Sequence, residues 1–477
     1  MRTQLQVLSA DEQQQLHERT LKVLSTIGMR VDTAQGRALL KAAGANVDEA
    51  THQVLFPPEF VEDCIAKATK QFSLGGRKPG FEAKMNAGEF TLIADGGTTT
   101  VLDRVTGERR DPQPQDWWES TKLIDAIDDI GVYWWMVNGG IGNEAPADWV
   151  QYWTNLWGTF GKHVQDSFED VRLGPLLKET LQTIFGSADE VRRIKPFSFL
   201  ITPVSPLTIE EHYTEAFLSL KGMGIPAAIM PMPLAGASAP GSMSAVTLLA
   251  NCETLGVLCL TQAADPGTPV IYAPVIAIMD PRSGRYAGGG IENAINSAAG
   301  TQMARFYGLP VEASGCGTEH YVPSEQTAYE KAESTLLAVL ADPDMIVGPG
   351  TVGAATILSF EEIIMDIEMF RMARRAARGM KISEELWLDD ILAKVGPCGD
   401  FLGERSTRTN ARSGEWYLSD FGVHGSYDQW VKDGSKSTVE QARERVSEIL
   451  ASHASVPLPD DVLAELAKIK KRAADAS

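Results

Sequence analysis

The chain has 477 residues, of which 44% are hydrophobic and 22% are charged, a balance typical of globular proteins. Sixty-three acidic residues against 43 basic ones give a net charge of −20, which argues against a nucleic-acid or anionic-membrane binder because both need a positive field. The five cysteines are too few for a disulfide framework and indicate a reducing compartment. With no signal peptide and no uncharged apolar run of ~18–20 residues, we expect a cytoplasmic protein without a membrane span.

Residues 1–88 predict an N-terminal helical extension. The capping box Ser9-x-x-Glu12 begins a first helix, a second is expected over residues 34–43, and a third follows Pro58. The Gly-, Lys- and Pro-rich segment 75–88 predicts a loop that leads to a new unit.

From about residue 90, short apolar runs that end in Gly, Pro, Asn or Asp alternate with longer amphipathic segments. Strand-like runs separated by helices are typical of parallel β-α units, and eight of them close a barrel. The runs are Phe90–Asp95, Gly131–Asn138, His163–Ser167, Phe197–Pro203, Ala227–Leu234, Val270–Met279, Val311–Ser314 and Met345–Gly348. The alternative is an open doubly wound sheet, but no G-x-G-x-x-G follows an early strand, and Gly288-Gly289-Gly290 is a weak phosphate signal.

We therefore predict an α/β fold, a TIM (β/α)8 barrel over residues 89–360 with helical extensions at both ends. The C-terminal region, residues 361–477, is expected to be helical again, with helices over 361–378, 383–395 and 437–452.

Aromatic side chains are concentrated in one region, since seven of the ten tryptophans lie between Trp117 and Phe160. Rings that face a cavity hold a quaternary ammonium group by cation–π attraction, although packing in the core explains most single aromatics at least as well. Tyr133, Trp134 and Trp135 fall on a predicted barrel strand. Because alternate side chains of a strand face opposite sides, at most one or two of these three can line the lumen.

Polar side chains at the ends of the predicted strands are the next candidates, because active sites of barrels form at the carboxyl ends of the strands. They are Asp95, Asn138, His163, Gln165, Asp166, Thr202, Ser205, Asp280, Arg282, Thr318, Glu319 and His320. Helix capping explains several of them at least as well as catalysis does. Cys316 and His320 allow a nucleophile–base pair, although a small loop thiol is the simpler interpretation. The scattered His and Cys predict no metal site.

Two long segments resemble a known family. The first covers residues 231–341 and begins PMPLAGASAPGSMSAVTLLANCETLGVLC, and the second is RRAARGMKISEELWLDDILAKVGPCGDFLGERSTR. Both are similar to the trimethylamine methyltransferase superfamily, corrinoid-dependent enzymes that move a methyl group from a methylated amine to the cobalt of a separate corrinoid protein. The resemblance covers nearly the whole chain. It implies a barrel enzyme with no tightly bound cofactor of its own, a cognate corrinoid protein as partner, and a homo-oligomer.

Aligning the family's pyrrolysine segment with residues 315–321 places Gly317 at the pyrrolysine position. The chain therefore resembles the pyrrolysine-free branch, which includes glycine betaine methyltransferases. A tertiary amine is a poor methyl donor unless its nitrogen is first protonated or captured by an electrophile, whereas a quaternary ammonium leaves as a neutral amine. Binding the donor and orienting one methyl group toward cobalt are then sufficient, and positioning alone can lower a barrier by up to roughly 7–11 kcal/mol. Since Co(I) of the partner is the nucleophile, we expect no catalytic residue in this chain.

The resemblance and the residue patterns together nominate a set of substrate-binding residues. Rings are expected to hold the trimethylammonium head, a cationic or polar side chain to anchor the carboxylate of glycine betaine, and a glycine to leave space for the head. The rings are Tyr133, Trp134, Trp135 and Tyr321, the anchors His163, Arg282 and His320, and the glycine Gly317.

Two alternatives remain open. Many relatives carry two histidines in the segment that here is Gly399–Thr407, and both are replaced. The same reaction with proline betaine, carnitine or a methylated sulfonium therefore remains possible. From a different class, a non-catalytic betaine-binding protein is also compatible with the sequence, because an aromatic cage alone gives binding.

Overall fold

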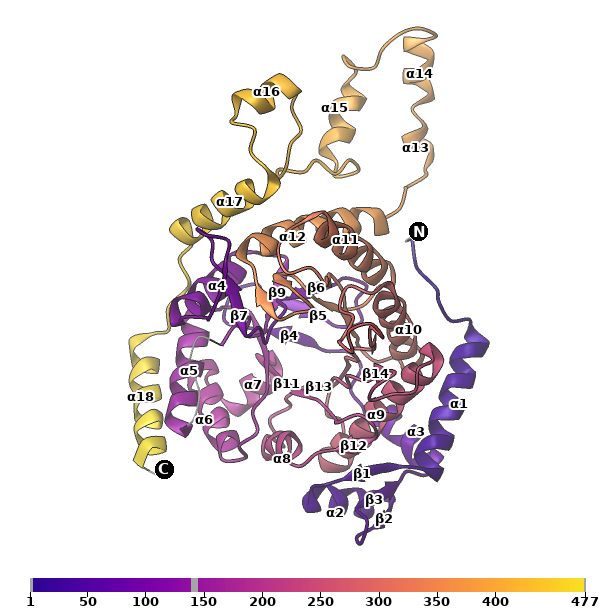
Figure 1. Ribbon diagram of the computed structural model, residues 1–477, viewed down its shortest axis with the longest axis vertical. Helices are drawn as coiled ribbons and strands as arrows, with labels where there is room; N and C mark the ends of the chain where they lie inside the picture. The colour runs from indigo at the N-terminus through magenta and orange to yellow at the C-terminus, as the bar shows by residue number, and fades with distance from the viewer. Residues whose placement is uncertain (1–2, 139–144, 476–477) are drawn as a thin grey trace.

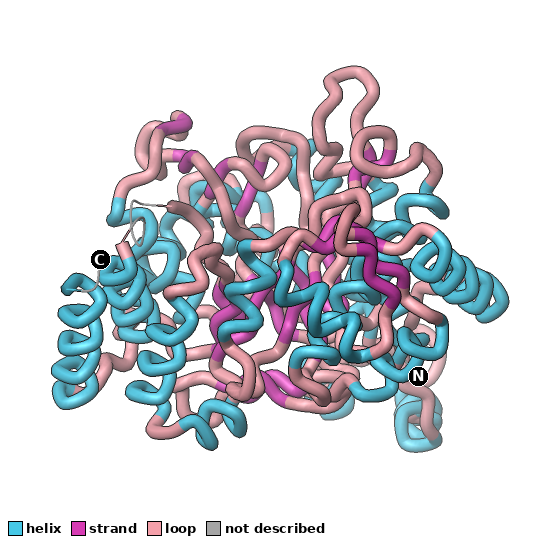
Figure 2. Tube along the Cα trace, turned by 90° about the horizontal axis from the view of Figure 1, so that it is seen from below, coloured by secondary structure: helices cyan, strands magenta, loops and turns pink. Residues whose placement is uncertain are grey.

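A closed ring of parallel strands forms the centre of the protein (Figures 1 and 2). The computed structural model describes residues 3–138 and 145–475. Strand β18 pairs with β6, and a bridge between Tyr272 and Val311 joins β15 to β17, so the sheet closes on itself. Around the ring and along the chain the strands are β6 (Thr91–Ile93), β9 (Ile130–Tyr133), β10 (His163–Asp166), β11 (Phe197–Ile201), β13 (Ala227–Ile229), β15 (Val270–Tyr272), β17 (Glu312–Ser314) and β18 (Met345–Val347).

Seven barrel strands fall within the predicted runs and the eighth, β9, begins one residue before its run, so the predicted TIM barrel is confirmed. The open doubly wound sheet is excluded by the closure between β15 and β17. The helices that surround the ring are α4 (Pro114–Ala126), α5 (Pro146–Thr159), α6 (Leu173–Phe185), α7 (Ala188–Ile194), α8 (His212–Ser219), α9 (Met243–Ala264), α10 (Ile291–Tyr307), α11 (Glu325–Leu340) and α12 (Phe360–Ala377).

Helix α9 is the most apolar of these helices, and by length and composition it could cross a membrane. However, 78% of its most apolar window is buried inside the protein, where it packs against α1, α2, α3 and α10. Its apolar surface is therefore explained by its place between the barrel and the N-terminal helices, as expected for a core helix.

The N-terminal segment packs on the outside of the barrel against α9. The capping box at Ser9 forms as predicted, and the second helix ends at Gly44, whose φ of +117° suits glycine. A small sheet joins this segment to the barrel, because β1 pairs in parallel with β12. The elements are α1 (Ala10–Thr26), β1 (Met29–Val31), α2 (Ala34–Ala43), β2 (Asn46–Asp48), β3 (Gln53–Leu55), α3 (Pro58–Lys67) and β12 (Thr208–Ile209).

The segment predicted as a loop, residues 75–88, contains part of a β-hairpin, so that prediction was incomplete. Strand β4 (Ser73–Gly75) pairs antiparallel with β5 (Glu82–Lys84). Leu74 and Ala83 are buried against barrel-interior side chains, in one apolar cluster with Ile93, Val132, Ile271 and Met345. The strands are only three residues long and their connection is rich in Gly, Lys and Pro, which explains why the pattern suggested a loop. The hairpin closes the amino-terminal end of the barrel.

At the opposite end, short strands extend the loops that follow the barrel strands and build a wall around the mouth. Strands β19 and β20 pair with β7 and β8 in one sheet, and β14 pairs with β16 in another. Their bounds are β7 (Thr100–Leu102), β8 (Arg109–Arg110), β14 (Leu234–Ala235), β16 (Ala277–Ile278), β19 (Thr351–Val352) and β20 (Ile357–Leu358).

The C-terminal helices divide into two groups. Helix α17 (Thr438–Ser452) packs on α12 and α4, and α18 (Asp460–Asp475) packs on α5 and α6. Between α12 and α17 the chain forms an arm that stands away from the barrel (Figure 1), and none of its helices buries a residue. They are α13 (Glu384–Trp387), α14 (Asp389–Val395), α15 (Arg405–Arg412) and α16 (Tyr427–Lys432). The helix expected over 383–395 is interrupted at Leu388, where φ is +55°.

Candidate functional site

The carboxyl ends of the barrel strands surround a cavity of about 350 Å³, here called the central cavity. Seven of the eight barrel strands, or the residues directly after them, contribute to its wall. The side chains that the argument uses are Asp95 after β6, Trp134 after β9, Thr202 after β11, Met230 and Met232 after β13, and Tyr286 from a loop after β16. This is the end of the barrel at which active sites of this fold form.

Trp134 is held in the cavity wall by a chain of buried polar groups. Its indole Nε1 donates a hydrogen bond to Oε1 of Gln165, and Nε2 of Gln165 donates to Oε2 of Glu312 at 2.9 Å. Burial raises the pKa of Glu312 to about 8, so this carboxyl is protonated at neutral pH. The network fixes the ring orientation without placing a charge beneath it.

A carboxylate, Asp95, lies in the same wall. The backbone N–H of Gly96 and the hydroxyl of Thr351 both donate to it. Burial raises its pKa, while these two hydrogen bonds oppose the rise. Tyr286 is the second ring of the wall. Its pKa is raised by burial and, to a lesser extent, by the charges of Asp95 and Glu319. Two aromatic rings and one desolvated carboxylate suit a cationic ligand.

Glycines bring two loops into contact at the cavity. A Cβ on Gly317 would meet the carbonyl oxygen of Gly288 at 2.2 Å, and a Cβ on Gly289 would meet Glu330 Oε2 at 2.6 Å. Gly317 therefore lines the cavity with its backbone, and the space in which its side chain would start is filled by Gly288. Gly288 and Gly289 serve this close approach and Gly290 is the N-cap residue of α10, so the triple glycine is explained without a phosphate.

Behind the cavity wall lies a buried ion cluster. Nζ of Lys331 on α11 is 2.7 Å from Oδ2 of Asp366 and 3.1 Å from Oε2 of Glu362, and all three side chains have an exposed fraction of 1% or less. The backbone N–H of Gly350 also donates to Asp366, at 2.8 Å. Since Gly348 and Thr351 line the cavity, the cluster anchors the loop after β18 from behind.

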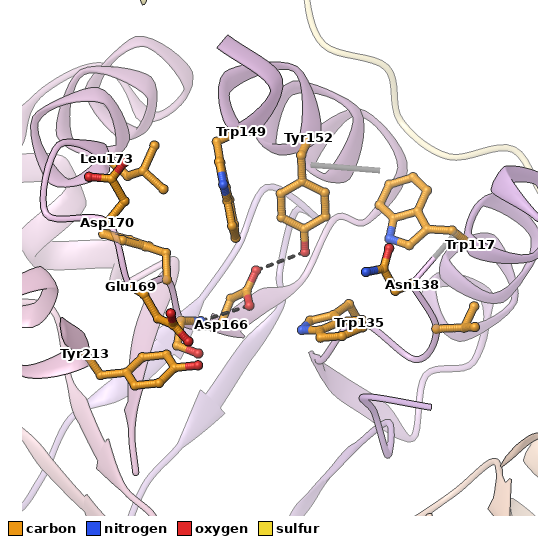
Figure 3. A pocket seen from close by; sticks show the side chains of 13 residues that line it. Trp117, Trp135, Asn138, Trp149, Tyr152, Asp166, Glu169, Asp170, Leu173 and Tyr213 are labelled. Atoms are coloured by element: carbon orange, nitrogen blue, oxygen red, sulfur yellow. Dashed lines mark hydrogen bonds between the residues drawn. The ribbon is translucent and has the colours of Figure 1, made fainter. Parts of the chain in front are cut away.

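A groove runs from the central cavity across the top of β10 toward α5, α6 and α8, and we call it the side groove. Its inner part, about 580 Å³, shares Trp134, Gly96 and Thr202 with the central cavity. Its outer part, about 400 Å³, is an aromatic box (Figure 3). The rings of the box are Trp117, Trp135, Trp149, Tyr152, Phe168 and Tyr213.

Asp166 lies at the centre of this box (Figure 3). It accepts hydrogen bonds from the hydroxyl of Tyr152 at 2.9 Å and from the backbone N–H of Ser167 at 2.8 Å. Burial raises its pKa to about 7, and these hydrogen bonds offset only part of the rise. Glu169, Asp170 and Glu210 also line the groove, so both cavities combine rings with acidic groups.

The predicted substrate-binding residues lie in different parts of the barrel, and only some of them line a cavity. Trp134 and Gly317 line the central cavity, and Trp135 lines the side groove. Tyr133 faces outward, where its hydroxyl accepts a hydrogen bond from Trp117 Nε1 at 2.9 Å. His163 lies at the wrong end of the barrel, because it is the first residue of β10 rather than the last.

His163 also lacks the charge that an anchor needs. Its ring nitrogens are bonded to Ser198 Oγ at 2.8 Å and to the carbonyl of Lys195 at 2.9 Å. Burial lowers its pKa to about 3, so the ring is neutral.

The remaining nominated residues lie outside both cavities. The side chain of Arg282 is 88% exposed and paired with Asp280, and His320 is bonded locally to the carbonyl of Val322 and to Ser324 Oγ. Tyr321 is 53% exposed, and its hydroxyl accepts a hydrogen bond from Arg285.

Cys316 is buried beside the Lys331 cluster, where burial raises the pKa of its thiol well above the ordinary value, and the ring nitrogen Nδ1 of His320 is engaged elsewhere. Within the described ranges, no group of three or more His, Cys, Asp or Glu is arranged to hold a metal ion. The segment Gly399–Thr407, which departs from relatives, lies on the arm.

Some residues of the site were not foreseen. Tyr286 lies in a loop far along the chain, and only its place beside the triple glycine hinted at a role. Tyr213 and Glu169 stand in helical or loop segments that carry no motif. Asp95, Asp166 and Thr202 were among the predicted strand-end residues, and all three do line the mouth.

The fold is a TIM barrel whose mouth combines rings, carboxylates and close-packed glycine loops, and comparison with known proteins identifies the family. The sequence matches the trimethylamine methyltransferase family over residues 1–138 and 175–477. The chain belongs to this family of methylated-amine methyltransferases.

Individual relatives span the whole chain. It is 27% identical to a trimethylamine methyltransferase of Desulfitobacterium hafniense, over 98% of this chain and 94% of that protein. It is also 27% identical to a trimethylamine methyltransferase of Methanosarcina barkeri (98% and 95%) and to a glycine betaine methyltransferase of Desulfitobacterium hafniense (96% and 95%). Among solved structures, the monomethylamine methyltransferase of Methanosarcina barkeri is similar, with a TM-score of 0.49 and 12% identity over 92% of this chain and 91% of that one.

Proposed function

We propose that this protein moves a methyl group from a quaternary amine to Co(I) of a separate corrinoid protein. The observation that carries the proposal is the central cavity, where Trp134, Tyr286 and Asp95 surround a space at the open end of the barrel. In the reaction the C–N bond breaks and its electron pair stays on nitrogen. Co(I) supplies the pair for the new Co–C bond and becomes Co(III).

The chain's residues would bind and aim the donor rather than react with it. Rings attract a trimethylammonium group by ~0.5–2 kcal/mol each, depending on desolvation, and Asp95 adds a charge of opposite sign. Gly317, at the position aligned with pyrrolysine, has no side chain, so no electrophile is offered there. A quaternary donor needs none, because its leaving group is a neutral amine, and this supports a quaternary rather than a tertiary donor.

Spectroscopy of the corrinoid tests the proposal. The protein is mixed with reduced cob(I)alamin and a quaternary donor, with tetramethylammonium, choline and glycine betaine tried in turn. Methyl-Co(III) absorbance should appear with at least one donor and should depend on the protein. Calorimetric binding without any spectral change would instead favour a non-catalytic binding protein, and neither binding nor turnover would refute the proposal.

The donor, the partner and the compartment complete the proposal. Glycine betaine, giving dimethylglycine, is the donor that the sequence resemblance suggests, and proline betaine and carnitine carry the same head. Which of these quaternary amines reacts depends on how the site binds the part of the donor beyond its trimethylammonium head. The acceptor is a corrinoid held by its own protein, which presents its cofactor at the mouth of the barrel. A cytoplasmic homo-oligomer remains our expectation, and the five cysteines, all unpaired, agree with a reducing compartment.

Cation binding is expected to strengthen as the pH rises from 6 to 8. Asp166, with its pKa raised to about 7, is neutral below that pH and anionic above it. Asp166 lines the inner part of the side groove, which shares Trp134 with the central cavity, so its anionic form can attract a cation held at that ring. Because an opposite charge within ~4–6 Å shifts a pKa by ~1–3 units, a cation bound at that distance should gain roughly three- to tenfold in affinity. Calorimetric titration of the protein with tetramethylammonium at constant ionic strength measures it.

Two variants test whether Asp166 causes this pH dependence of cation binding. The other ionisable groups that face Asp166 or the groove are Tyr152, Tyr213, Glu169, Asp170, Glu210 and His212. Asp166→Asn should flatten the profile, whereas His212→Gln should retain it. A profile that is flat in the wild-type protein, or that persists in Asp166→Asn, contradicts the assignment.

A further inference from the structure

The charge of the residues that line the two cavities restricts which group the donor can carry beyond its trimethylammonium head. In the described ranges, the residues that line the central cavity and the side groove include five carboxylates and neither lysine nor arginine. The one histidine among them is His212. Residues 139–144, which follow the groove residue Asn138, read GGIGNE and contain no basic side chain. The carboxylates are Asp95, Asp166, Glu169, Asp170 and Glu210.

Most of this negative charge is not balanced by basic side chains. Asp170 is paired with Arg172, whose guanidinium is 2.7 Å away and 68% exposed. Across the described part of the chain, the other four carboxylates take part in no ion pair. They accept hydrogen bonds from neutral groups instead, such as Tyr152 for Asp166 and the backbone N–H of Tyr213 for Glu210.

The residues expected to anchor a donor carboxylate lie elsewhere. His163 is neutral at the floor of the barrel, Arg282 is directed to solvent against Asp280, and His320 is bonded to its own loop. Two arginines lie next to the site without lining it: Arg172, which is paired with the groove residue Asp170, and Arg285, which donates to the exposed Tyr321 at 3.0 Å. A donor with a carboxylate would therefore meet acidic groups along the groove and no basic partner in the lining.

We infer that the methyl donor is a quaternary ammonium compound with an uncharged polar tail, of the choline class, rather than a betaine. The inference rests on the proposed function and adds the chemistry of the tail. The head is held by Trp134, Tyr286 and Asp95, and the tail extends into the side groove. There a hydroxyl can donate to Asp166 or Glu169, whereas a carboxylate in the same place would be repelled by Glu169 and by the ionised form of Asp166.

Three donors that share one head test the inference. Tetramethylammonium has no tail, choline ends in a hydroxyl, and glycine betaine ends in a carboxylate. Calorimetry on the protein alone gives the three affinities, and the appearance of methyl-Co(III) with cob(I)alamin gives kcat/KM. We expect choline to exceed glycine betaine at least tenfold in both measurements, with tetramethylammonium binding no weaker than glycine betaine.

Charge variants in the groove sharpen the comparison. Glu169 is exposed, so Glu169→Lys should fold, and it should raise the affinity for glycine betaine while lowering that for choline. Glu18→Lys, on the outer helix α1, is the matched control and should leave the ratio of the two donors unchanged. Arg172→Ala and Arg285→Ala test the two arginines that lie next to the site, and neither should lower the affinity for glycine betaine.

The outcomes separate the two proposals. Glycine betaine binding or reacting as well as choline overturns the inference, as does a selective loss of glycine betaine affinity in Arg172→Ala or Arg285→Ala. If choline binds tenfold more tightly but no donor yields methyl-Co(III), the tail preference stands and the proposed methyl transfer fails. If none of the three donors binds, both are overturned.

Discussion

Replacing Lys331 with methionine is expected to lower the free energy of unfolding by ~3–5 kcal/mol, the usual cost of leaving buried charge without its partner. Lys331 is the cation between Asp366 and Glu362, and all three side chains are almost fully buried. The charges of Asp366 and Glu362 raise the pKa of Lys331 against the effect of burial, so the wild-type lysine is charged. Urea unfolding followed by circular dichroism measures the loss.

A surface pair provides the control for this variant. Lys394 is paired with Glu404 on the arm, and its side chain is 65% exposed, so Lys394→Met should cost less than ~1 kcal/mol. The double variant Lys331→Met/Asp366→Leu should recover part of the lost stability, since it removes one of the two unpaired carboxylates. A Lys331→Met protein as stable as the wild type would show that the cluster does not hold the loop after β18.

Replacing Trp134 with alanine is expected to weaken tetramethylammonium binding by roughly tenfold or more, because a desolvated cation–π contact is worth about 2 kcal/mol. The change also removes the donor to Gln165 and so loosens the chain that ends at Glu312. Calorimetry gives the affinity, and the rate of methyl-Co(III) formation should fall with it.

Two further variants test whether the effect is specific. Trp134→Phe keeps a ring but loses the indole N–H, so it should retain most of the affinity. Trp387→Ala, on α13 of the arm and 53% exposed, should change nothing. Unaltered binding in Trp134→Ala would place the cation outside the central cavity.

The barrel was predictable because each strand is a short apolar run closed by a turn-forming residue. It was harder to predict which side of its strand each side chain faces. Tyr133 and Trp134 are neighbours with similar rings, yet one packs against the helix layer and the other faces the cavity, and only the register of β9 decides which. His163 was assigned to the wrong end of its strand, since it is the first residue of the predicted run His163–Ser167 and of β10, and barrel sites form at the carboxyl end.

The loops account for most of what the sequence did not reveal. Arg282 follows a predicted strand, but a tight turn pairs it with Asp280 and directs it to solvent. Tyr286, four residues later, returns to the cavity wall. Such positions depend on how a loop folds back on the barrel, and local residue patterns do not contain that information. Of the acidic lining, Asp95 and Asp166 were among the predicted strand-end residues, whereas Glu169, Asp170 and Glu210 lie in loops whose sequence carries no motif.

The hairpin β4–β5 closes one end of the barrel, so the central cavity opens at the mouth. Leu74 and Ala83 fill its amino-terminal end, so nothing enters or leaves through the floor. An acceptor as large as a corrinoid protein that docks over the mouth would therefore shut in whatever the cavity already contains. Under the proposed reaction the amine therefore has to bind before its acceptor, and the demethylated product leaves after the acceptor departs.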